Sequence, residues 1–224
     1  MPVFTPLRMA RDLPVCIRPD EQRWQAAPQA PVKRWPLERE APEQGQVTSL
    51  VEYLPGAHFP EHRHPAGEEI LVLSGIFSDE GGDYPAGSYL RSPAASGHSP
   101  FSEQGCLLFV KLNQFAADDR QTLRLSPDSL RWKTIAAGQQ QCQLHAHGCE
   151  QTLLIDCAGG ALLQMPAQQG GELLVLHGAL QERQQGAIGV LPAHSWVRDP
   201  ALTQRCFQAL EPSRVLLKLG ALRV

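Results

Sequence analysis

Hydrophobic residues occur along much of the chain in short runs that have the length of β-strands. The clearest runs are VTSLVEYL (47–54), EILVLSGIF (69–77) and CLLFVKL (106–112), which are rich in valine, leucine, isoleucine and aromatic residues. Nineteen glycines and nineteen prolines separate such runs at short intervals, and both residue types favour turns. No segment combines a helical period of apolar residues with caps over three turns. The pattern predicts a nearly all-β fold.

The pattern repeats after about a hundred residues. EILVLSG at 69–75 matches ELLVLHG at 172–178, at an offset of 103 residues. At nearly the same offset, TSLVEYLPGA at 48–57 matches QTLLIDCAGGA at 151–161, with a slip of one residue. A repeat of this length indicates a duplicated domain and not a solenoid.

The boundary between the two domains is expected in the polar segment AADDRQTLRLSPDS at 116–129. We therefore expect an N-terminal domain at residues 1–118 and a C-terminal domain at residues 119–224. RWKTI at 131–135 would then open the second domain, much as KRWPL at 33–37 begins the first.

Composition and charge narrow the classes of function. The chain is 42% hydrophobic and 19% charged, with a formal net charge of −3. This near-neutral balance gives no electrostatic footprint for nucleic acid or for an anionic membrane. No apolar run approaches the length of a membrane span, and the opening MPVFTPLRMARDLP lacks the apolar core of a signal peptide. We expect a cytoplasmic protein with neither nucleic acid nor membrane as a partner.

The six cysteines form no C-x-x-C pair, so a structural zinc knuckle is not expected. In a reducing compartment they are expected to be free thiols. Cys106 and Cys206 lie in or beside apolar segments and are predicted to pack as small hydrophobic residues. Cys149 lies in the polar segment HAHGCEQ and is expected to be exposed.

A group of residues that can bind a metal precedes the apolar run at 69–77. The pattern G-x5-H-x-H-x3-E-x6-G is filled by Gly56, His62, His64, Glu68 and Gly75. A P-x-G at 85–87 follows, and then YLRSPAASGH, which ends at His98. These segments resemble, in order, the two signature motifs of the cupin superfamily. The resemblance implies two tandem jelly-roll barrels, the second of them degenerate.

The spacing of these residues has a physical reason. Alternate residues of a strand face the same side, so the imidazoles of His62 and His64 should both point into a barrel. Glu68 follows a short turn into the adjoining strand, and His98 arrives from a later strand. Three imidazoles and one carboxylate suit a divalent metal. We expect one divalent ion at these four residues, zinc first, with iron, manganese or nickel as alternatives.

Glu69 competes with Glu68 for the role of carboxylate ligand. The distance from His64 alone allows either residue, whereas the distance to Gly75 favours Glu68. Strand alternation allows only one of the two to face inward. Glu69 is then expected to face outward or to hold a histidine N–H from behind the ligands.

A second H-x-H pair, His145 and His147, aligns by the repeat with residues 42–44, upstream of the metal motif. No carboxylate follows at the right distance. We interpret this pair as a polar strand end and not as metal ligands.

The second repeat has lost the metal-binding set. Met165, Ala167 and Gly171 stand at the positions of His62, His64 and Glu68, while Glu172 matches Glu69 and His194 loosely matches His98. We expect an apolar pocket lined in part by Met165, with a retained small-molecule pocket as the alternative. His177 is interpreted as a strand-end residue, and His194 as a core residue with its polar atoms satisfied.

The segment GEEILVLSGIFSDEGGDYPAGSYLRSPAASGHSPFSEQGCLLFVKLNQF (67–115) resembles the cupin domain of ChrR-type anti-sigma factors. The resemblance covers about residues 45–120, and the second half is similar only as a decayed copy. It implies zinc bound through His62, His64, Glu68 and His98, and a response to singlet oxygen and peroxides. The chain is thus expected to be a metal-binding bicupin that acts as a sensor or regulator of oxidative stress.

ChrR proteins also carry an N-terminal helical domain that binds the sigma factor and has its own His/Cys zinc ligands. The opening residues of this sequence show no such helices and no H-x3-C-x2-C motif. Anti-sigma activity, and a sigma factor as partner, are therefore not expected from these residues. A small-molecule ligand or an oxidant, and a second copy of the chain in a homodimer, are the expected partners.

The same cupin type resembles small non-haem iron dioxygenases that cleave β-dicarbonyl compounds with three histidines. A metal-dependent dioxygenase, a sensor and a purely structural metal site therefore all stay open. Tyr89, Arg91, Phe109 and Lys111 lie on strands near the site. Arg91 and Lys111 are expected to face solvent; if they faced the pocket instead, they would suit an anionic substrate.

Overall fold

The structure is a computed structural model that describes residues 4–28, 30–42, 45–183 and 188–222. Within these ranges the regular elements are β-strands and short 3₁₀ turns, so the prediction of a nearly all-β fold is confirmed. No helix in the described ranges is long and apolar enough to cross a membrane.

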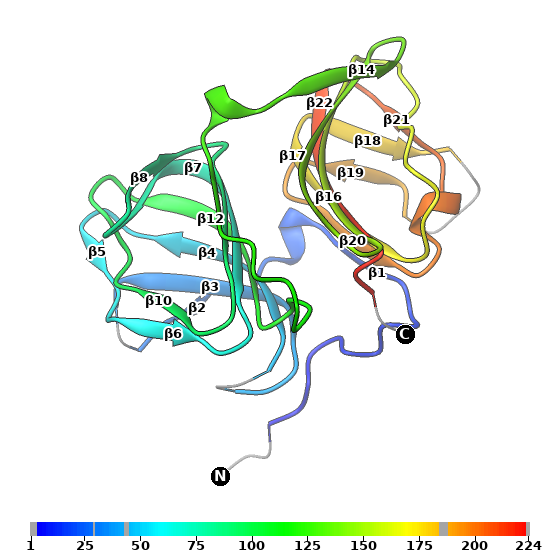
Figure 1. Ribbon diagram of the computed structural model, residues 1–224. Helices are drawn as coiled ribbons and strands as arrows, with labels where there is room; N and C mark the ends of the chain where they lie inside the picture. Colours follow the sequence, from blue (N-terminus) through cyan, green and yellow to red (C-terminus); the bar gives the residue numbers. More distant parts are fainter. Residues whose placement is uncertain (1–3, 29, 43–44, 184–187, 223–224) are drawn as a thin grey trace. The chain divides into compact units, whose positions relative to one another are not determined.

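The chain forms two compact units (Figure 1). The first unit comprises Met1–Met9 and Arg23–Ser129. Its elements are β2 (Gln25–Ala26), β3 (Val32–Arg39), β4 (Val47–Tyr53), β5 (Ala57–His58), β6 (His62–His64), β7 (Glu68–Asp79), β8 (Gly82–Pro85), β9 (Tyr89–Ser92), β10 (Ser96–His98), β11 (Phe101–Ser102), β12 (Cys106–Leu112), β13 (Leu123–Leu125) and the 3₁₀ turn η2 (Pro127–Ser129).

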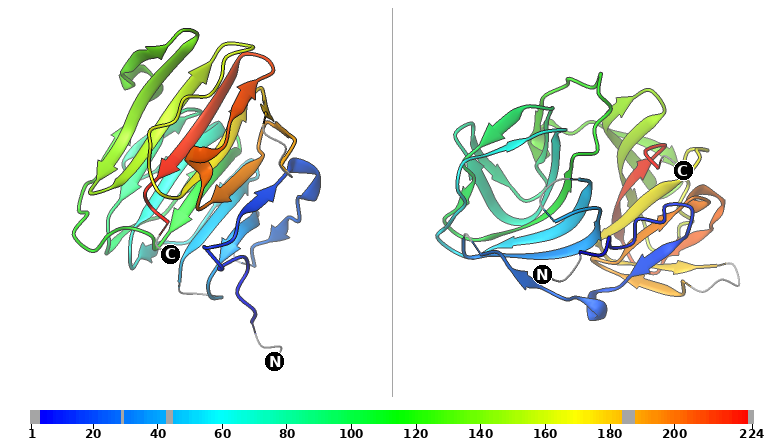
Figure 2. Two further views of the ribbon diagram at one scale, coloured as in Figure 1. Left: turned by 90° about the vertical axis from the view of Figure 1, so that its right-hand side faces the viewer. Right: turned by 90° about the horizontal axis from the view of Figure 1, so that it is seen from below.

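The strands of the first unit are paired antiparallel. The main sheet has the order β13-β9-β7-β12-β4-β3-β2, and β6 pairs with β10 in a separate ladder. The long strand β7 also pairs with β8 and β11 beyond a bulge near its middle, so it takes part in both walls. In the right-hand view of Figure 2 these strands curve round to form a barrel.

The second unit comprises Ala10–Gln22 and Leu130–Val224. Its elements are β1 (Val15–Ile17), η1 (Pro19–Glu21), β14 (Trp132–Ala136), β15 (Gln139–His147), β16 (Glu150–Cys157), β17 (Gly171–His177), β18 (Ala179–Glu182), β19 (Val190–Pro192), β20 (Trp196–Asp199), η3 (Leu202–Gln204), β21 (Phe207–Ala209) and β22 (Ser213–Leu219). Its main sheet has the order β1-β20-β17-β22-β16-β15-β14, and β19-β18-β21 form a smaller one.

The two units follow the repeat, but their boundaries differ from the expected division at residues 118 and 119. Residues 10–22 belong to the second unit because β1 pairs with β20 along its whole length, from Val15 opposite Arg198 to Ile17 opposite Trp196. Residues 119–129 belong to the first unit because β13 pairs with β9. Both ladders join segments that are far apart in the sequence, and the local pattern carries no sign of them.

The core of each unit follows from strand alternation. In the first unit, the side chains on the inner face of the sheet include Val51, Ile70, Leu108 and Val110, which pack in one cluster. The second unit has a larger inner cluster, which includes Leu153, Leu173, Phe207 and Leu217.

The cysteines are free thiols, as expected. Cys106 is buried and packs in the core of the first unit, while Cys206 is half-buried. Cys149 is exposed, as its polar surroundings predict.

Candidate metal site

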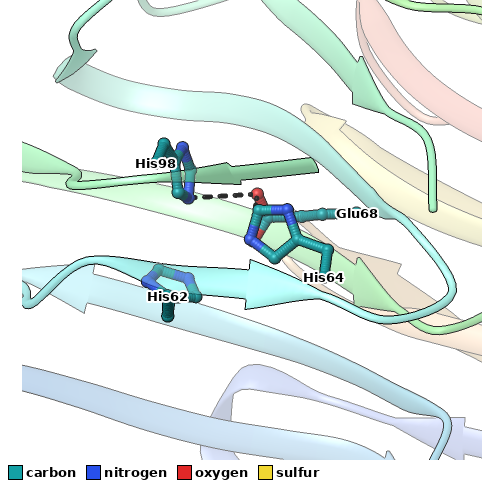
Figure 3. Close-up of side chains that lie close together, drawn as sticks. All are labelled: His62, His64, Glu68 and His98. Atoms are coloured by element: carbon teal, nitrogen blue, oxygen red, sulfur yellow. Dashed lines mark ion pairs between the residues drawn. The ribbon is translucent and has the colours of Figure 1, made fainter. Parts of the chain in front are cut away.

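The four side chains that the sequence singled out converge inside the first unit (Figure 3). His62 and His64 come from β6, Glu68 from the start of β7 and His98 from β10. His98 lies directly opposite His62 in the β6–β10 ladder. One ligand atom from each residue can be chosen so that all four lie within 4.8 Å of one another.

The turn between β6 and β7 sets the spacing of His64 and Glu68. Gly67 has a φ of +89°, which glycine adopts without strain. A Cβ atom at Gly67 would also lie 2.6 Å from the Phe115 ring, so a larger residue cannot fit. The turn is tied down by Asn113, whose N–H donates to the Gly67 carbonyl and whose side-chain oxygen accepts the Ala66 N–H.

Each imidazole is oriented through its Nδ1 atom. The Nδ1 of His62 is 3.0 Å from the Pro60 carbonyl, that of His64 is 3.2 Å from Ser96 Oγ, and that of His98 is 3.2 Å from the Asp79 carboxylate. A carbonyl and a carboxylate only accept hydrogen bonds, so His62 and His98 carry their proton on Nδ1. Their Nε2 lone pairs are then available to a metal.

The remaining imidazole atoms fit a divalent cation. The Nε2 atoms of His64 and His98 are buried and have no hydrogen-bond partner in the described part of the chain. Each is 3.4 Å from Glu68 Oε2. Ligand atoms in a tetrahedral zinc site with bonds of about 2.0–2.1 Å are roughly 3.4 Å apart. The His/Glu cluster could therefore hold a metal ion.

The charges of the cluster favour a cation as well. Burial lowers the pKa of His64 to about 3 and raises that of Glu68 to about 6. Burial also lowers the pKa of His62. Burial acts in the same direction on His98, but its bond to Asp79 and the nearby carboxylates outweigh burial and raise the pKa. His62 and His64 are therefore neutral ligands near pH 7, and a bound cation would keep Glu68 ionised.

A cavity of about 420 Å³ opens beside the cluster, within the first unit. Three of the four candidate ligands, His62, Glu68 and His98, line it. Its wall is mixed: polar side chains alternate with apolar ones that include Ile70 and Val110. The site therefore has room for a small molecule next to the metal position.

Glu69 is not a ligand in this arrangement. Its carboxylate accepts hydrogen bonds from the Tyr89 hydroxyl, at 2.9 Å, and from Arg91, at 3.0 Å. Arg91 also pairs with Asp119 at 2.5 Å. Glu69 therefore faces outward from the barrel, which is one of the two expected alternatives, but it is buried there in an ionic network and does not hold the N–H of a candidate ligand histidine.

The prediction that Arg91 and Lys111 face solvent is wrong, and neither residue lines the cavity. Both are fully buried. They lie on the face of the main sheet opposite the inner cluster, where Glu69 lies between them across the neighbouring strands. Lys111 donates to the Thr48 hydroxyl at 2.8 Å. Tyr89 and Phe109 share this face, so none of the four residues contributes to the cavity wall.

The second H-x-H pair, His145 and His147, lies outside the His/Glu cluster. The pair lies at the end of β15, as expected, but His145 is buried opposite Thr152 and so does not form an exposed polar end. His147 ends the strand and is half-buried. His177 is exposed at the end of β17, as expected, with Nδ1 3.2 Å from the Pro212 carbonyl.

Strand register fixes several equivalences between the two units. Gly171 pairs with Leu219 as Glu68 pairs with Leu112, so Gly171 does occupy the position of the carboxylate ligand. The N–H of His194 donates to Val175 as that of Gly87 donates to Val72. His194 therefore corresponds to Gly87 and not to His98.

His194 accordingly lies in a turn, half-buried, with a φ of +68°, and is not the expected core residue. Gln181 pairs with Gln208 in the second unit as Ser78 pairs with Phe101 in the first. Arg205 precedes Gln208 by three residues, as His98 precedes Phe101, so Arg205 stands at the position of His98. By the same ladders Glu182 corresponds to Asp79, and it binds Arg205 at 2.6 Å. An ion pair thus replaces the histidine–carboxylate pair in the second unit. Met165 packs against its apolar core.

Asp79 contacts the candidate ligand His98, and the sequence motif did not indicate it. It ends β7, and its second carboxylate oxygen accepts the Gly81 N–H at 2.7 Å and the Tyr84 hydroxyl at 3.1 Å. These bonds fix the carboxylate that orients His98. An acidic residue at the end of a strand that begins at a candidate ligand is a weak signal, and the pairing of Phe101 in β11 with Ser78 in β7 is what brings the segment after His98 next to Asp79.

We expect Asp79→Asn to weaken metal binding by about 10- to 100-fold, the usual effect of losing a group that supports a ligand. The asparagine amide would present a donor to His98 Nδ1, and the imidazole would then carry its proton on Nε2, where the metal binds. Titration of the metal-free chain with zinc, against a competing chelator, measures the change.

Glu80→Gln is the matched control for this prediction. Glu80 is exposed next to Asp79, and its carboxylate accepts the Ser99 N–H. The Glu80→Gln variant should bind zinc with the same affinity as the unmodified chain. Equal affinity in the Asp79 and Glu80 variants would show that Asp79 does not orient the ligand.

Several solved structures of known proteins are similar in fold to this chain. The chain is similar to protein YlbA from Escherichia coli, with a TM-score of 0.70, 12% identity and coverage of 97% of this chain and 95% of that one. It is similar to the bacterial pirin YhhW from Escherichia coli in complex with nickel(II), with a TM-score of 0.68, 15% identity and coverage of 92% and 98%.

A third similar structure is a salicylate 1,2-dioxygenase from Pseudaminobacter salicylatoxidans, with a TM-score of 0.62, 14% identity and coverage of 99% of this chain and 86% of that one. At such identities these similarities show the fold alone. Among curated proteins no sequence matches the chain.

The fold of the chain is that of two tandem cupin barrels, and the first of them has a His/Glu cluster that could hold a metal. Within that fold class, residues 13–116 match the family described as the ChrR Cupin-like domain. The resemblance found in the sequence is thereby confirmed.

Proposed function

We propose that the first unit binds one divalent metal ion through His62, His64, Glu68 and His98 and acts as a metal-dependent dioxygenase on a small oxygenated molecule. The observation that carries this proposal is the cavity of about 420 Å³ beside the cluster. A structural zinc site is closed by its protein ligands, whereas a catalytic site keeps room for a substrate.

When bound, the metal would supply Lewis acidity towards an oxygenated substrate and, in the case of iron, redox chemistry with dioxygen. The chain supplies the remaining functions. Asp79 holds His98 in one tautomer, and the apolar side chains of the cavity wall, which include Ile70, can pack against the bound molecule. Glu68, with a pKa of about 6, can serve as a fourth ligand or accept a proton from the substrate near neutral pH.

Two of the structures with a similar fold bear on the choice of metal. The similar salicylate 1,2-dioxygenase is an enzyme of the proposed reaction class, and the similar pirin holds nickel(II). Iron is the metal that dioxygenase chemistry favours here, since three histidines and a carboxylate suit it.

A second candidate function is a sensor of oxidants with zinc in the same cluster. Four protein ligands suffice to fill a tetrahedral zinc shell, and the family match is to the ChrR Cupin-like domain. In this case an oxidant or a ligand would alter the shell and change a surface that a partner recognises.

Elemental analysis of the chain, purified without a metal-chelating column, separates the two candidates when it is followed by oxygen uptake. If the chain is a dioxygenase, the iron-loaded protein should consume dioxygen with acetylacetone as a test β-dicarbonyl compound. The His98→Ala variant should not. About one zinc per chain that resists chelators, with no oxygen uptake after iron loading, would contradict the enzyme and support the sensor.

A further inference from the structure

The outer face of the main sheet in the second unit has a row of polar side chains. The row crosses five neighbouring strands, β14, β15, β16, β22 and β17, and its members lie opposite one another in register: Thr134, Gln140, Asp156, Arg214 and His177. Ile155 and Val215, which are next to members of the row along β16 and β22, pack in the inner cluster. The row therefore faces away from the barrel interior. Neighbouring strands are about 4.8 Å apart, so the row spans about 19 Å.

All five members of the row line a hollow of about 780 Å³. Residues beside the ends of the strands form its rim, among them Gly138, Ala158 and Pro212. Gly171 and Arg205, which stand at the positions of Glu68 and His98, are not part of its wall. The hollow is therefore a different place in the barrel from the metal cluster of the first unit.

An ion pair held at two points forms the middle of the row. Nε of Arg214 donates to Oδ1 of Asp156 at 2.5 Å, and Nη2 donates to Oδ2 at 2.7 Å. The guanidinium carbon is 4.8 Å from the centre of the Trp132 ring, which holds the guanidinium in a defined plane. A guanidinium has five donors and a carboxylate accepts up to about four hydrogen bonds, so the pair can also bind a ligand. Because both side chains are already held in place, a ligand would lose little affinity in ordering them.

The remaining polar groups of the hollow differ in their tasks. Thr134 and Gln140 are exposed and add a hydroxyl and a carboxamide, each of which both donates and accepts hydrogen bonds. His177 ends the row, and its Nδ1 is 3.2 Å from a backbone carbonyl. Gln139 and Ser213 are buried, and their side chains bond to the backbone. The row thus presents planar polar groups of mixed donor and acceptor character.

The ion pair is particular to the second unit. Leu107 pairs with Glu52 in the first unit as Arg214 pairs with Asp156 in the second. Leu107 precedes Leu112 by five residues, as Arg214 precedes Leu219, so the two positions correspond. The first unit forms the same ladder with a leucine at this position, and the fold therefore does not require the arginine.

We infer that the hollow binds a neutral saccharide of two or more rings, whose hydroxyls pair with Gln140, Asp156 and Arg214. One carboxylate and one guanidinium cancel in charge, so a neutral ligand suits the hollow better than an ion. Two adjacent hydroxyls of a sugar ring can bond to both ends of a carboxylate, a guanidinium or a carboxamide, and each hydroxyl donates as well as accepts. The length of the row suits more than one ring, and the C–H face of a ring can pack on Ala158 and Pro212.

Titration of the full chain, labelled with ¹⁵N and followed by NMR, tests the inference with cellobiose, maltose and lactose as probes. At least one of them should shift the backbone signals of β15, β16 and β22 in a saturable way. Gln140→Ala should weaken its binding by about 3- to 10-fold, the effect of one hydrogen bond. Asp156→Ala removes charged hydrogen bonds and should weaken it by roughly 10- to 100-fold.

Gln143→Ala is the matched control, because Gln143 is an exposed glutamine on the same strand as Gln140 but does not line the hollow. It should change the affinity by less than about twofold. Equal affinity in the Gln140 and Gln143 variants would overturn the assignment of the site. Failure of all three disaccharides to bind, or binding of the charged sugars glucuronate or glucosamine alone, would overturn the inference of a neutral saccharide.

Discussion

The His64→Ala variant should purify with less than about a tenth of the metal content of the unmodified chain. His64 is the most deeply buried imidazole of the cluster, and its Nε2 is 3.4 Å from Glu68. Its removal leaves an incomplete shell in a site that no other described imidazole can complete. Elemental analysis after dialysis measures the loss.

The unfolding midpoint of His64→Ala should fall together with the metal content. A metal that binds only the folded state stabilises it by about 4 kcal/mol when the free ion is present at a thousand times its dissociation constant. Thermal unfolding with and without a chelator should therefore show a metal-dependent difference in the unmodified chain that the variant lacks.

His177→Ala is the control for this prediction, since His177 is exposed at a strand end in the second unit. It should keep both the metal and the midpoint. If the two variants retained equal metal, the assignment of the ligands would be wrong.

The Glu69→Gln variant should keep its metal but lose about 3–5 kcal/mol of stability, the range found when one partner of a buried ion pair is removed. Arg91 has no exposed surface, and Glu69 is 3% exposed. Glutamine would remove the charge that the Arg91 guanidinium faces at 3.0 Å, and it would weaken the bond from Tyr89. Urea unfolding measures the loss.

Glu52→Gln provides the comparison with an exposed pair. Glu52 meets Lys33 at 3.2 Å, and their side chains are 39% and 45% exposed. This change should cost less than about 1 kcal/mol.

Glu68→Gln should behave in the opposite way to Glu69→Gln and lose metal. Loss of metal in Glu69→Gln, with retention in Glu68→Gln, would mean that the two carboxylates have been exchanged.

The spacing of residues in the first unit determined much of the candidate site. His62 and His64 are two apart on one strand, so they share a face, and a four-residue step from His64 to Glu68 leaves room for one tight turn. Such relations depend on local geometry, which is the same wherever the strand lies. They also separated Glu68 from Glu69, because neighbouring residues of a strand face opposite sides.

The sequence by itself thus determined the all-β fold, the duplication and the order of the residues in the metal cluster. The tertiary structure decided which distant segments pair: residues 10–22 with the second unit, Asp79 with His98, and Asp156 with Arg214. It also decided that Arg205 stands where a repeat offset suggested His194. These outcomes depend on sheet register between segments remote in sequence, and a one-residue shift there exchanges the face of every side chain.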